Sequence, residues 1–383
     1  MENVNRKRWF FSSTNIAAIA YCAMLLYAAA CSLKRPAYNW DILPYMGVVL
    51  SYDEADVKMV HSEVYAIAKK EIPAVYYNRM VDPLNTYRNS VAQDPEVFHS
   101  QFPFYIVKPL YTRLAWCFYK MGIALPVATV LPSVIAYILT GLLLFVWTRR
   151  YWNAWWACIG SMLIMLCPPL ITVAGLSSPD AISALLVFAA VFFLTEKKSL
   201  TGTIICLLLS IFARLDNILP ALFFLLVIFF SNKWNERPST LKSLLLFGLF
   251  CVSFFIVSAS VYSFGWSVLY YPAFAKQLNT SYSNNNSFDF AAYLSLAKTQ
   301  LATGLYFSFV SIFFLLVLLL LWNNKGYSTS QLTLEQMLVI VFVLIMVIRF
   351  VLQPLVTDRI YVPYYLSVFV FLIKKDSLII NRI

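Results

Sequence analysis

The chain contains a succession of mainly apolar segments, each close to the length needed to cross a membrane. Of its 383 residues, 61% are hydrophobic and only 12% are charged, whereas a soluble globular domain is roughly 45–50% apolar. About 20 apolar residues in a helix span the roughly 30 Å hydrocarbon core of a bilayer. The sequence therefore predicts an all-α, polytopic membrane protein built as a bundle of transmembrane helices.

The apolar segments predict ten spans, at about 10–31, 125–147, 153–175, 179–195, 199–213, 217–231, 241–262, 302–322, 334–353 and 359–373. The stretch 104–121 is also rather apolar, but it carries Lys108, Arg113 and Lys120. A basic residue at mid-membrane costs about 2.5–3.5 kcal/mol on insertion scales. We therefore expect this stretch to form a helix on the membrane surface instead of a span.

Basic residues predict which loops face the cytoplasm. With the N-terminus in the cytoplasm, every short cytoplasmic loop of the ten-span topology holds at least one Lys or Arg, as the positive-inside rule requires. Both termini are then cytoplasmic, and the long segments at about 32–124 and 263–301 are external. We expect residues 1–383 to form one integral-membrane domain of a bacterial inner membrane, with juxtamembrane helices after the first span. Because topology explains the net charge of +11, no nucleic-acid partner is expected.

Four groups of charged residues lie at the external ends of predicted spans. They are Asp41; Asp180; Arg214 with Asp216; and Asp358 with Arg359, while Arg349 lies one or two turns inside the ninth span. Ionisable groups near the hydrocarbon are costly and usually face a polar cavity. Because all four groups are predicted on the same side of the membrane, we expect them to belong to a single site.

Each of these groups also has a structural interpretation. Asp180 follows Ser178 and Pro179, so it can simply cap a helix. Arg214 and Asp216 can pair across a tight turn. Asp358 and Arg359 can anchor a helix end at the interface, and Asp41 can be an ordinary loop acid.

Acids and basic groups in one external cavity suit a particular chemistry. A carboxylate can act as general base on an acceptor hydroxyl. Arginine and lysine can hold a phosphate and stabilise it as a leaving group, and apolar helices can accept a lipid tail. The combination points to transfer of a group from a lipid-linked phosphate donor.

Five short motifs resemble those of a known family. In chain order they are YNWDILPY with Asp41, VKPLYTRLAWCFYKMG with Lys108, LSSPDA with Asp180, ARLDN with Arg214, and DRIYVPYY with Arg359, Tyr361 and Pro363. In their order, spacing and sidedness over roughly residues 10–373, the chain resembles the GT-C superfamily of integral-membrane glycosyltransferases, which use polyprenyl-phosphate-linked sugars. It is nearest in pattern to the protein mannosyltransferases and the lipid A aminoarabinose transferases. It is shorter than most of them and lacks the soluble C-terminal domain of many.

The resemblance implies roles for particular residues. Asp41 would be catalytic; Lys108, Arg214 and Arg359 would bind the donor phosphate; Asp180, Asp216, Asp358 and Tyr361 would support the site or the substrate. Metal use stays open, because the first acid is single where some relatives have a pair, and no metal ligand is assigned. His61 and Glu63 in VHSEVY can be metal ligands or a solvated helix face.

The implied partners are a lipid-linked sugar donor, a glycan, lipid or protein acceptor, and membrane lipids. The main alternative is a transporter or lipid flippase, which would place charges near mid-membrane and often repeat its topology in two halves. A non-enzymatic scaffold of the cell envelope is a third interpretation.

Overall fold

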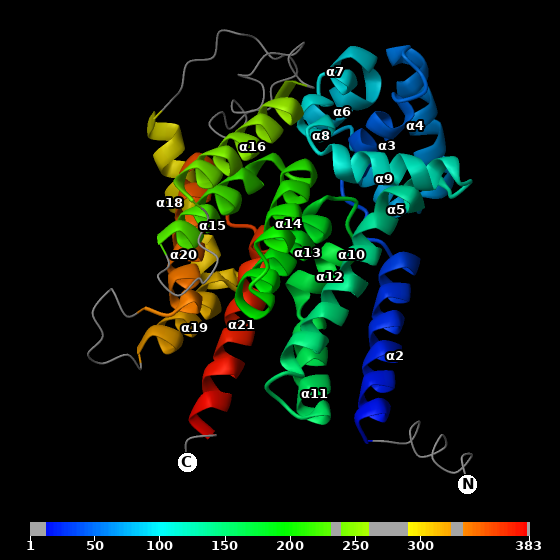
Figure 1. Cartoon of the computed structure of the whole chain (residues 1–383). Coiled ribbons are helices and arrows are strands. Elements are labelled where there is room, and N and C mark those ends of the chain that lie inside the picture. The colour runs from blue at the N-terminus through cyan, green and yellow to red at the C-terminus, as the bar shows by residue number, and fades with distance from the viewer. Residues whose placement is uncertain (1–12, 231–238, 260–289, 323–331, 381–383) are drawn as a thin grey trace.

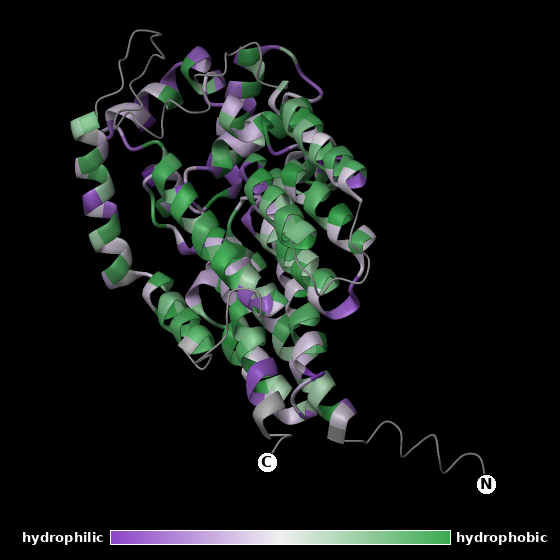
Figure 2. Cartoon of the chain, turned by 60° about the vertical axis from the view of Figure 1, so that its left-hand side comes forward, coloured by the Kyte–Doolittle hydropathy of each residue, from purple (hydrophilic) through white to green (hydrophobic). Residues whose placement is uncertain are grey.

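The computed structural model describes residues 13–230, 239–259, 290–322 and 332–380. These residues are almost all helical and contain no strand, which confirms the predicted all-α class. Hydrophobic residues cover the lengths of the long helices, and hydrophilic residues gather toward the two ends of the molecule (Figure 2). That distribution is compatible with an integral membrane protein.

The long helices form a bundle, and shorter helices cover one end of it (Figure 1). The bundle consists of α2 (Ser13–Lys34), α10 (Leu125–Thr148), α11 (Ala154–Met165), α12 (Pro168–Gly175), α13 (Asp180–Phe192), the π-helix η1 (Phe193–Lys197), α14 (Leu200–Ala213), the 3₁₀ turn η2 (Leu215–Asn217), α15 (Ile218–Phe230), α16 (Thr240–Ala259), α18 (Phe290–Phe307), α19 (Val310–Trp322), α20 (Leu334–Leu352) and α21 (Asp358–Ile380). The start of α2 and the end of α21 lie at the end away from the short helices.

The short helices, called the cap below, occupy the predicted external segment 32–124. They are α3 (Ile42–Leu50), α4 (Val57–Glu71), α5 (Ala74–Met80), α6 (Thr86–Gln93), α7 (Pro95–His99), α8 (Pro103–Ile106) and α9 (Pro109–Lys120). Every residue of α3 is buried. Gly47 permits this packing, because a Cβ there would lie 2.7–2.8 Å from ring atoms of Phe98 and Phe102. The cap is therefore closely packed around α3, and its buried residues continue into the hydrophobic core of the bundle.

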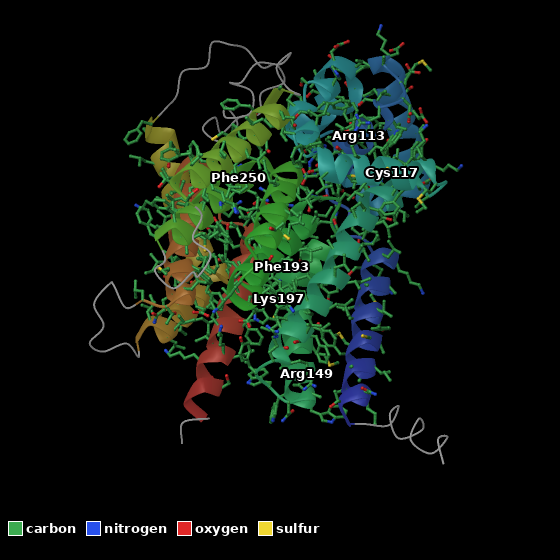
Figure 3. All side chains as sticks on the ribbon, viewed as in Figure 1. Arg113, Cys117, Arg149, Phe193, Lys197 and Phe250 are labelled. Atoms are coloured by element: carbon green, nitrogen blue, oxygen red, sulfur yellow. The ribbon has the colours of Figure 1, made fainter. Side chains whose placement is uncertain are left out.

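The helix predicted in 104–121 is present as α9, which lies across the end of the bundle in Figure 1. Pro109 occupies its first turn, where a missing N–H costs nothing, and Lys108 is the residue before it. Figure 3 shows Arg113 and Cys117 in the cap and Arg149 at the opposite end of the molecule.

Length and composition support fewer spans than the ten predicted. Among the described residues, four helices are long and apolar enough to cross a membrane, α2, α10, α16 and α20, and two bent helix pairs raise that number to six. The pair α11 and α12 bends by 64°, because Pro168 and Pro169 cannot donate to the preceding turn. The helices α13, α14 and α15 have 13, 14 and 13 residues. At 1.5 Å per residue each is roughly 20 Å long, shorter than the hydrocarbon core.

The last part of the predicted external segment 263–301 is helical. Residues 260–289 lie outside the described residues, but 290–301 belong to α18, which continues to Phe307 and meets α19 at an angle of 70°. At this bend the backbone N–H of Phe309 donates to Asp358 Oδ1 over 3.0 Å, and Tyr365 donates to the same oxygen. Asp358 therefore stabilises the bend between α18 and α19.

At the end of the bundle away from the cap, a cluster of ion pairs joins neighbouring helices. Glu196 in η1 accepts hydrogen bonds from Tyr151 (2.6 Å), Lys374 (3.0 Å) and Arg150 (3.1 Å). Lys374 also binds Glu335 at the start of α20 over 2.7 Å. One carboxylate, only 8% exposed, thus connects the α10–α11 turn with α13 and α21.

Replacing Glu196 by Gln is expected to lower the free energy of unfolding by about 1–3 kcal/mol, because two cations lose a buried charged partner. Thermal unfolding of the purified protein in detergent measures this change. Lys197→Ala, one residue along and exposed, is the matched control and should unfold at the native midpoint. Equal midpoints for all three proteins would show that the cluster contributes nothing to stability.

Candidate functional site

Asp41 lies directly before α3, with its carboxylate toward the bundle. Although it occupies the N-cap position, its side chain makes no capping bond to the helix. Its Oδ1 instead accepts from the Tyr105 hydroxyl (3.0 Å), and its Oδ2 accepts from Asn39 Nδ2 (2.7 Å). The side chain keeps 31% exposure. Asp41 is thus oriented by neutral donors while remaining accessible.

Asp180 is the most deeply buried acid of the group, with a side chain only 1% exposed. The interpretation as a simple helix cap is wrong, because Pro179 is the N-cap residue of α13 and no side-chain capping bond forms. The Asp180 carboxylate instead pairs with Arg214 and Arg359, and accepts from the Ser178 hydroxyl. It therefore joins the ends of α13, α14 and α21.

Arg214 and Asp216 form the predicted pair across a tight turn. Arg214 Nε and Nη2 donate to the two oxygens of Asp216 over 3.0 and 3.2 Å, the two-pronged geometry that suits a guanidinium and a carboxylate. Its Nη1 donates to Asp180. Arg214 thus also connects two acids.

Arg349 completes this network, although sequence reasoning gave it no role. It enters from α20, and its Nη2 lies 3.1 Å from Asp216 Oδ2 and 3.0 Å from Asn217 Oδ1. The one available signal was its position inside an apolar span, where an unpaired charge is costly. Tyr361, buried in the first turn of α21, lies within electrostatic reach of Arg349 and Asp216.

Arg359 lies between Asp41 and Asp180. Its Nε is 3.2 Å from Asp180 Oδ2, and its Nη1 is 3.9 Å from Asp41 Oδ2. The buried Nε makes no well-aligned hydrogen bond with any group that the structure describes. With 32% exposure, Arg359 has donors to offer to an incoming ligand.

Lys108 is the second cation with unused donors. Its Nζ donates to the Tyr45 hydroxyl over 3.0 Å and lies 5.0 Å from the centre of the Tyr105 ring. No carboxylate of the described ranges lies within ion-pair distance of it. Burial, together with the positive charge of Arg214, lowers the pKa of Lys108 to about 8. The sequence indicated Lys108 but not the tyrosines that hold it.

The charged cluster is defined here as Asp41, Lys108, Asp180, Arg214, Asp216, Arg349 and Arg359. When all are ionised it has one more positive charge than negative. Its members come from the cap and from four bundle helices or their ends, yet ion pairs link the acids and the arginines to one another. An excess of positive charge beside aromatic side chains favours an anionic ligand with an apolar part.

Asp358, His61 and Glu63, which were considered from the sequence, lie outside this cluster. Asp358 was predicted to support the site, but its carboxylate binds at the α18–α19 bend, because the neighbouring amide of Phe309 needs an acceptor there. His61 in α4 packs against Tyr65 and Phe98 and contacts the Val91 carbonyl, while Glu63 is exposed. Over the described part of the chain, no three His, Cys, Asp or Glu side chains are placed to share a metal ion.

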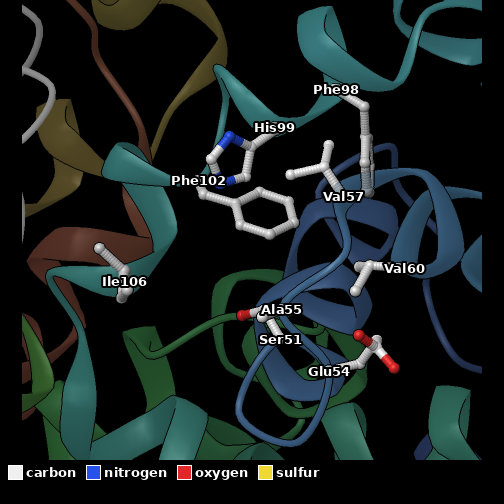
Figure 4. Close-up of a pocket in the computed structure, with 9 residues that line it drawn as sticks. All are labelled: Ser51, Glu54, Ala55, Val57, Val60, Phe98, His99, Phe102 and Ile106. Atoms are coloured by element: carbon white, nitrogen blue, oxygen red, sulfur yellow. The ribbon is translucent and has the colours of Figure 1, made fainter.

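The cap also contains a pocket of about 230 Å³, shown in Figure 4. Its lining is mostly apolar and includes Phe98, Phe102 and Ile106, with His99 and Glu54 as its ionisable members. It begins near Ser51, at the opposite end of α3 from Asp41. With no Lys or Arg in its lining, this pocket does not suit a phosphate.

No protein-family model matches the chain, and neither the curated proteins nor the solved structures include one with significant similarity to it.

Proposed function

We propose that the chain is a membrane glycosyltransferase that moves a sugar from a polyprenyl-phosphate-linked donor to an acceptor hydroxyl. The observation that carries the proposal is the convergence of an accessible carboxylate, Asp41, with two cations that have unused donors, Lys108 and Arg359. A base and a phosphate-binding pair are the groups that such a transfer needs. The GT-C resemblance of the sequence motifs agrees with this choice.

In the proposed reaction, Asp41 takes the proton of the acceptor hydroxyl while the acceptor oxygen attacks the anomeric carbon of the donor sugar. The bond between that carbon and the phosphate oxygen breaks, and the phosphate leaves on its lipid carrier with one more negative charge. Lys108 and Arg359 stabilise this charge. Arg214 is a positioning residue in this scheme, because its guanidinium already binds Asp180 and Asp216.

The proposed topology has the cap on the periplasmic side of a bacterial inner membrane and both termini in the cytoplasm. All ten predicted segments contain helix in the described residues, and the start of α2 and the end of α21 share one end of the bundle. The short helices α13, α14 and α15 would cross with their neighbours as one unit, since α13 is buried along most of its length. Membrane lipids, the donor and the acceptor are the proposed partners.

The titration of Lys108 provides a test of its role. The charged form binds phosphate, and this form is present below its pKa of about 8 and is lost as the pH rises through that value. The kcat/KM for the donor is therefore expected to fall above pH 8. In Lys108→Arg this fall should disappear, because a guanidinium stays charged. An unchanged pH profile in that variant would remove Lys108 from phosphate binding.

A transporter or lipid flippase is the second candidate. The observation in its favour is the presence of two bent helix pairs, α11–α12 and α18–α19, since discontinuous helices often form transport sites. The charged cluster, however, is joined to the cap through Asp41 and Lys108. Movement of a labelled lipid-linked sugar across sealed vesicles, without a new glycosidic bond, would favour this candidate.

The proposed function is tested by comparing surface glycans from a native strain and a gene-deleted strain by mass. We expect the deletion to remove a mass of one sugar residue, and the purified protein in detergent to form the glycosylated product from a polyprenyl-phosphate sugar. Intact glycans in the deleted strain and no product in detergent would contradict the proposal.

A further inference from the structure

A cavity of about 600 Å³ lies at the end of the bundle opposite the cap, between α2 and the turn that joins α10 to α11. Its lining includes Thr14, Arg149, Asn153, Trp155, Trp156 and Ile159. Figure 3 shows Arg149 at this end, far from the labelled residues of the cap. The cavity is therefore separate from the charged cluster and takes no part in the proposed transfer reaction.

Arg149 gives the cavity its charge. It follows the last residue of α10, and no carboxylate in the described ranges forms an ion pair with it. The neighbouring Arg150 differs, because it pairs with Glu196 over 3.1 Å. The two adjacent arginines thus differ: Arg150 belongs to the ion-pair cluster, whereas Arg149 lines the cavity.

Tryptophan side chains give the cavity an interfacial character. Trp155 and Trp156 are exposed, Trp156 to 62%, and exposed indole rings are enriched where membrane meets water. Exposed apolar side chains continue from the cavity along α11 at Ile159 and Leu163, and along α2 at Ile16. A polar group bound at Arg149 can therefore have hydrocarbon chains attached that follow these helices.

Internal contacts stabilise the turn between α10 and α11, which carries Arg149 and Asn153. Thr148 and Ser161 share a hydrogen bond of 3.0 Å between α10 and α11. The Trp152 ring rests directly on Gly160, where a Cβ would lie 2.5 Å from the ring. Asn153 caps α11 by accepting from the Trp156 N–H. The position of Arg149 relative to the tryptophans is thus set before any ligand binds.

We propose that this cavity binds the headgroup of an anionic phospholipid in the leaflet opposite the cap. Its phosphate would accept from Arg149, close to the first turn of α11, whose dipole also favours an anion. Its acyl chains would lie along Ile159, Leu163 and Ile16. Three features together favour a lipid over a soluble anion: the cavity, the exposed tryptophans, and Arg149 without an ion-pair partner among the described residues.

The test is native mass spectrometry of the purified full-length protein titrated with phosphatidylglycerol, with phosphatidylcholine as the neutral lipid. We expect one phosphatidylglycerol to bind in preference to phosphatidylcholine. Arg149→Ala should weaken this binding about fivefold or more, since one basic residue near a membrane surface contributes roughly 1 kcal/mol. Lys197→Ala, an exposed cation outside the cavity lining, should bind like the native protein.

Three results would overturn the proposal. Equal binding of the two lipids would exclude charge recognition, and equal binding by Arg149→Ala and the native protein would exclude this cavity. Displacement of the bound lipid by millimolar inorganic phosphate would identify a site for a free anion instead. Because Arg149→Ala removes only a partly exposed side chain, its thermal midpoint without added lipid should equal that of the native protein, which checks that the variant is folded.

Discussion

Replacing Asp41 by Asn is expected to lower the rate of sugar transfer by about 10²–10⁴-fold while leaving the fold intact. The amide cannot take a proton from the acceptor hydroxyl, and that factor is typical of a lost general base. The substitution keeps the local hydrogen bonds, because the new oxygen can accept from Asn39 while the new amide donates to Tyr105, whose hydroxyl both donates and accepts. Product formation by the purified variant in detergent measures the loss.

The matched control is Asp53→Asn. Asp53 is also a cap carboxylate with two partners, Trp116 and Lys120 at 3.0 Å each, but it lies outside the charged cluster. This variant should transfer sugar at the native rate. Full activity of Asp41→Asn would remove Asp41 from the chemistry, whereas equal losses in both variants would point to a general effect of altering the cap.

Replacing Asp180 by Asn is expected to lower the free energy of unfolding by about 3–5 kcal/mol. The change leaves the Arg214 and Arg359 guanidinium groups without the buried carboxylate that they share, and breaking a buried ion pair from one side costs about that much. Unfolding of the purified protein by heat or denaturant in detergent would show the change. Glu63→Gln, an exposed acid of α4, should have no such effect.

A double variant separates the contribution of the Asp180–Arg214 ion pair to stability from other effects of the Asp180→Asn change. Asp180→Asn combined with Arg214→Gln should destabilise the protein by less than the sum of the two single changes, because the second removes a cation that the first left unpaired. Additive effects, or a single-variant loss below about 1 kcal/mol, would contradict a stabilising role for this pair.

Local patterns predicted the helices well, since hydropathy and helix signals depend on neighbouring residues. The stretch 104–121 was expected to be a surface helix because of its three basic residues, and α9 begins at its Lys-Pro pair. Within 263–301 the same reasoning gave no helix, whereas α18 starts at Phe290. Nothing near Gly304 in the sequence indicates that the Val356 side chain packs against it or that Asp358 lies at the nearby bend.

The candidate site was predictable only in part. Predicted sidedness groups Asp41, Asp180, Arg214, Asp216, Asp358 and Arg359, because the predicted external ends of spans share one level of the membrane, but Asp358 lies at the α18–α19 bend. Sidedness does not say which of them touch. Tyr45 ends the YNWDILPY motif, but nothing in the sequence showed that Tyr45 contacts Lys108 or that Tyr105 contacts Asp41.

By itself, the amino-acid sequence determined that this is an all-helical protein with long apolar segments and a predicted surface helix, because segment length and hydropathy are properties of local sequence. Only the tertiary structure decided that Arg214 and Arg349 are occupied with carboxylates, whereas Lys108 and Arg359 keep donors without a partner among the described residues. That division depends on ångström distances between residues far apart in the chain. Those distances follow from how the helices pack, and no local pattern records them.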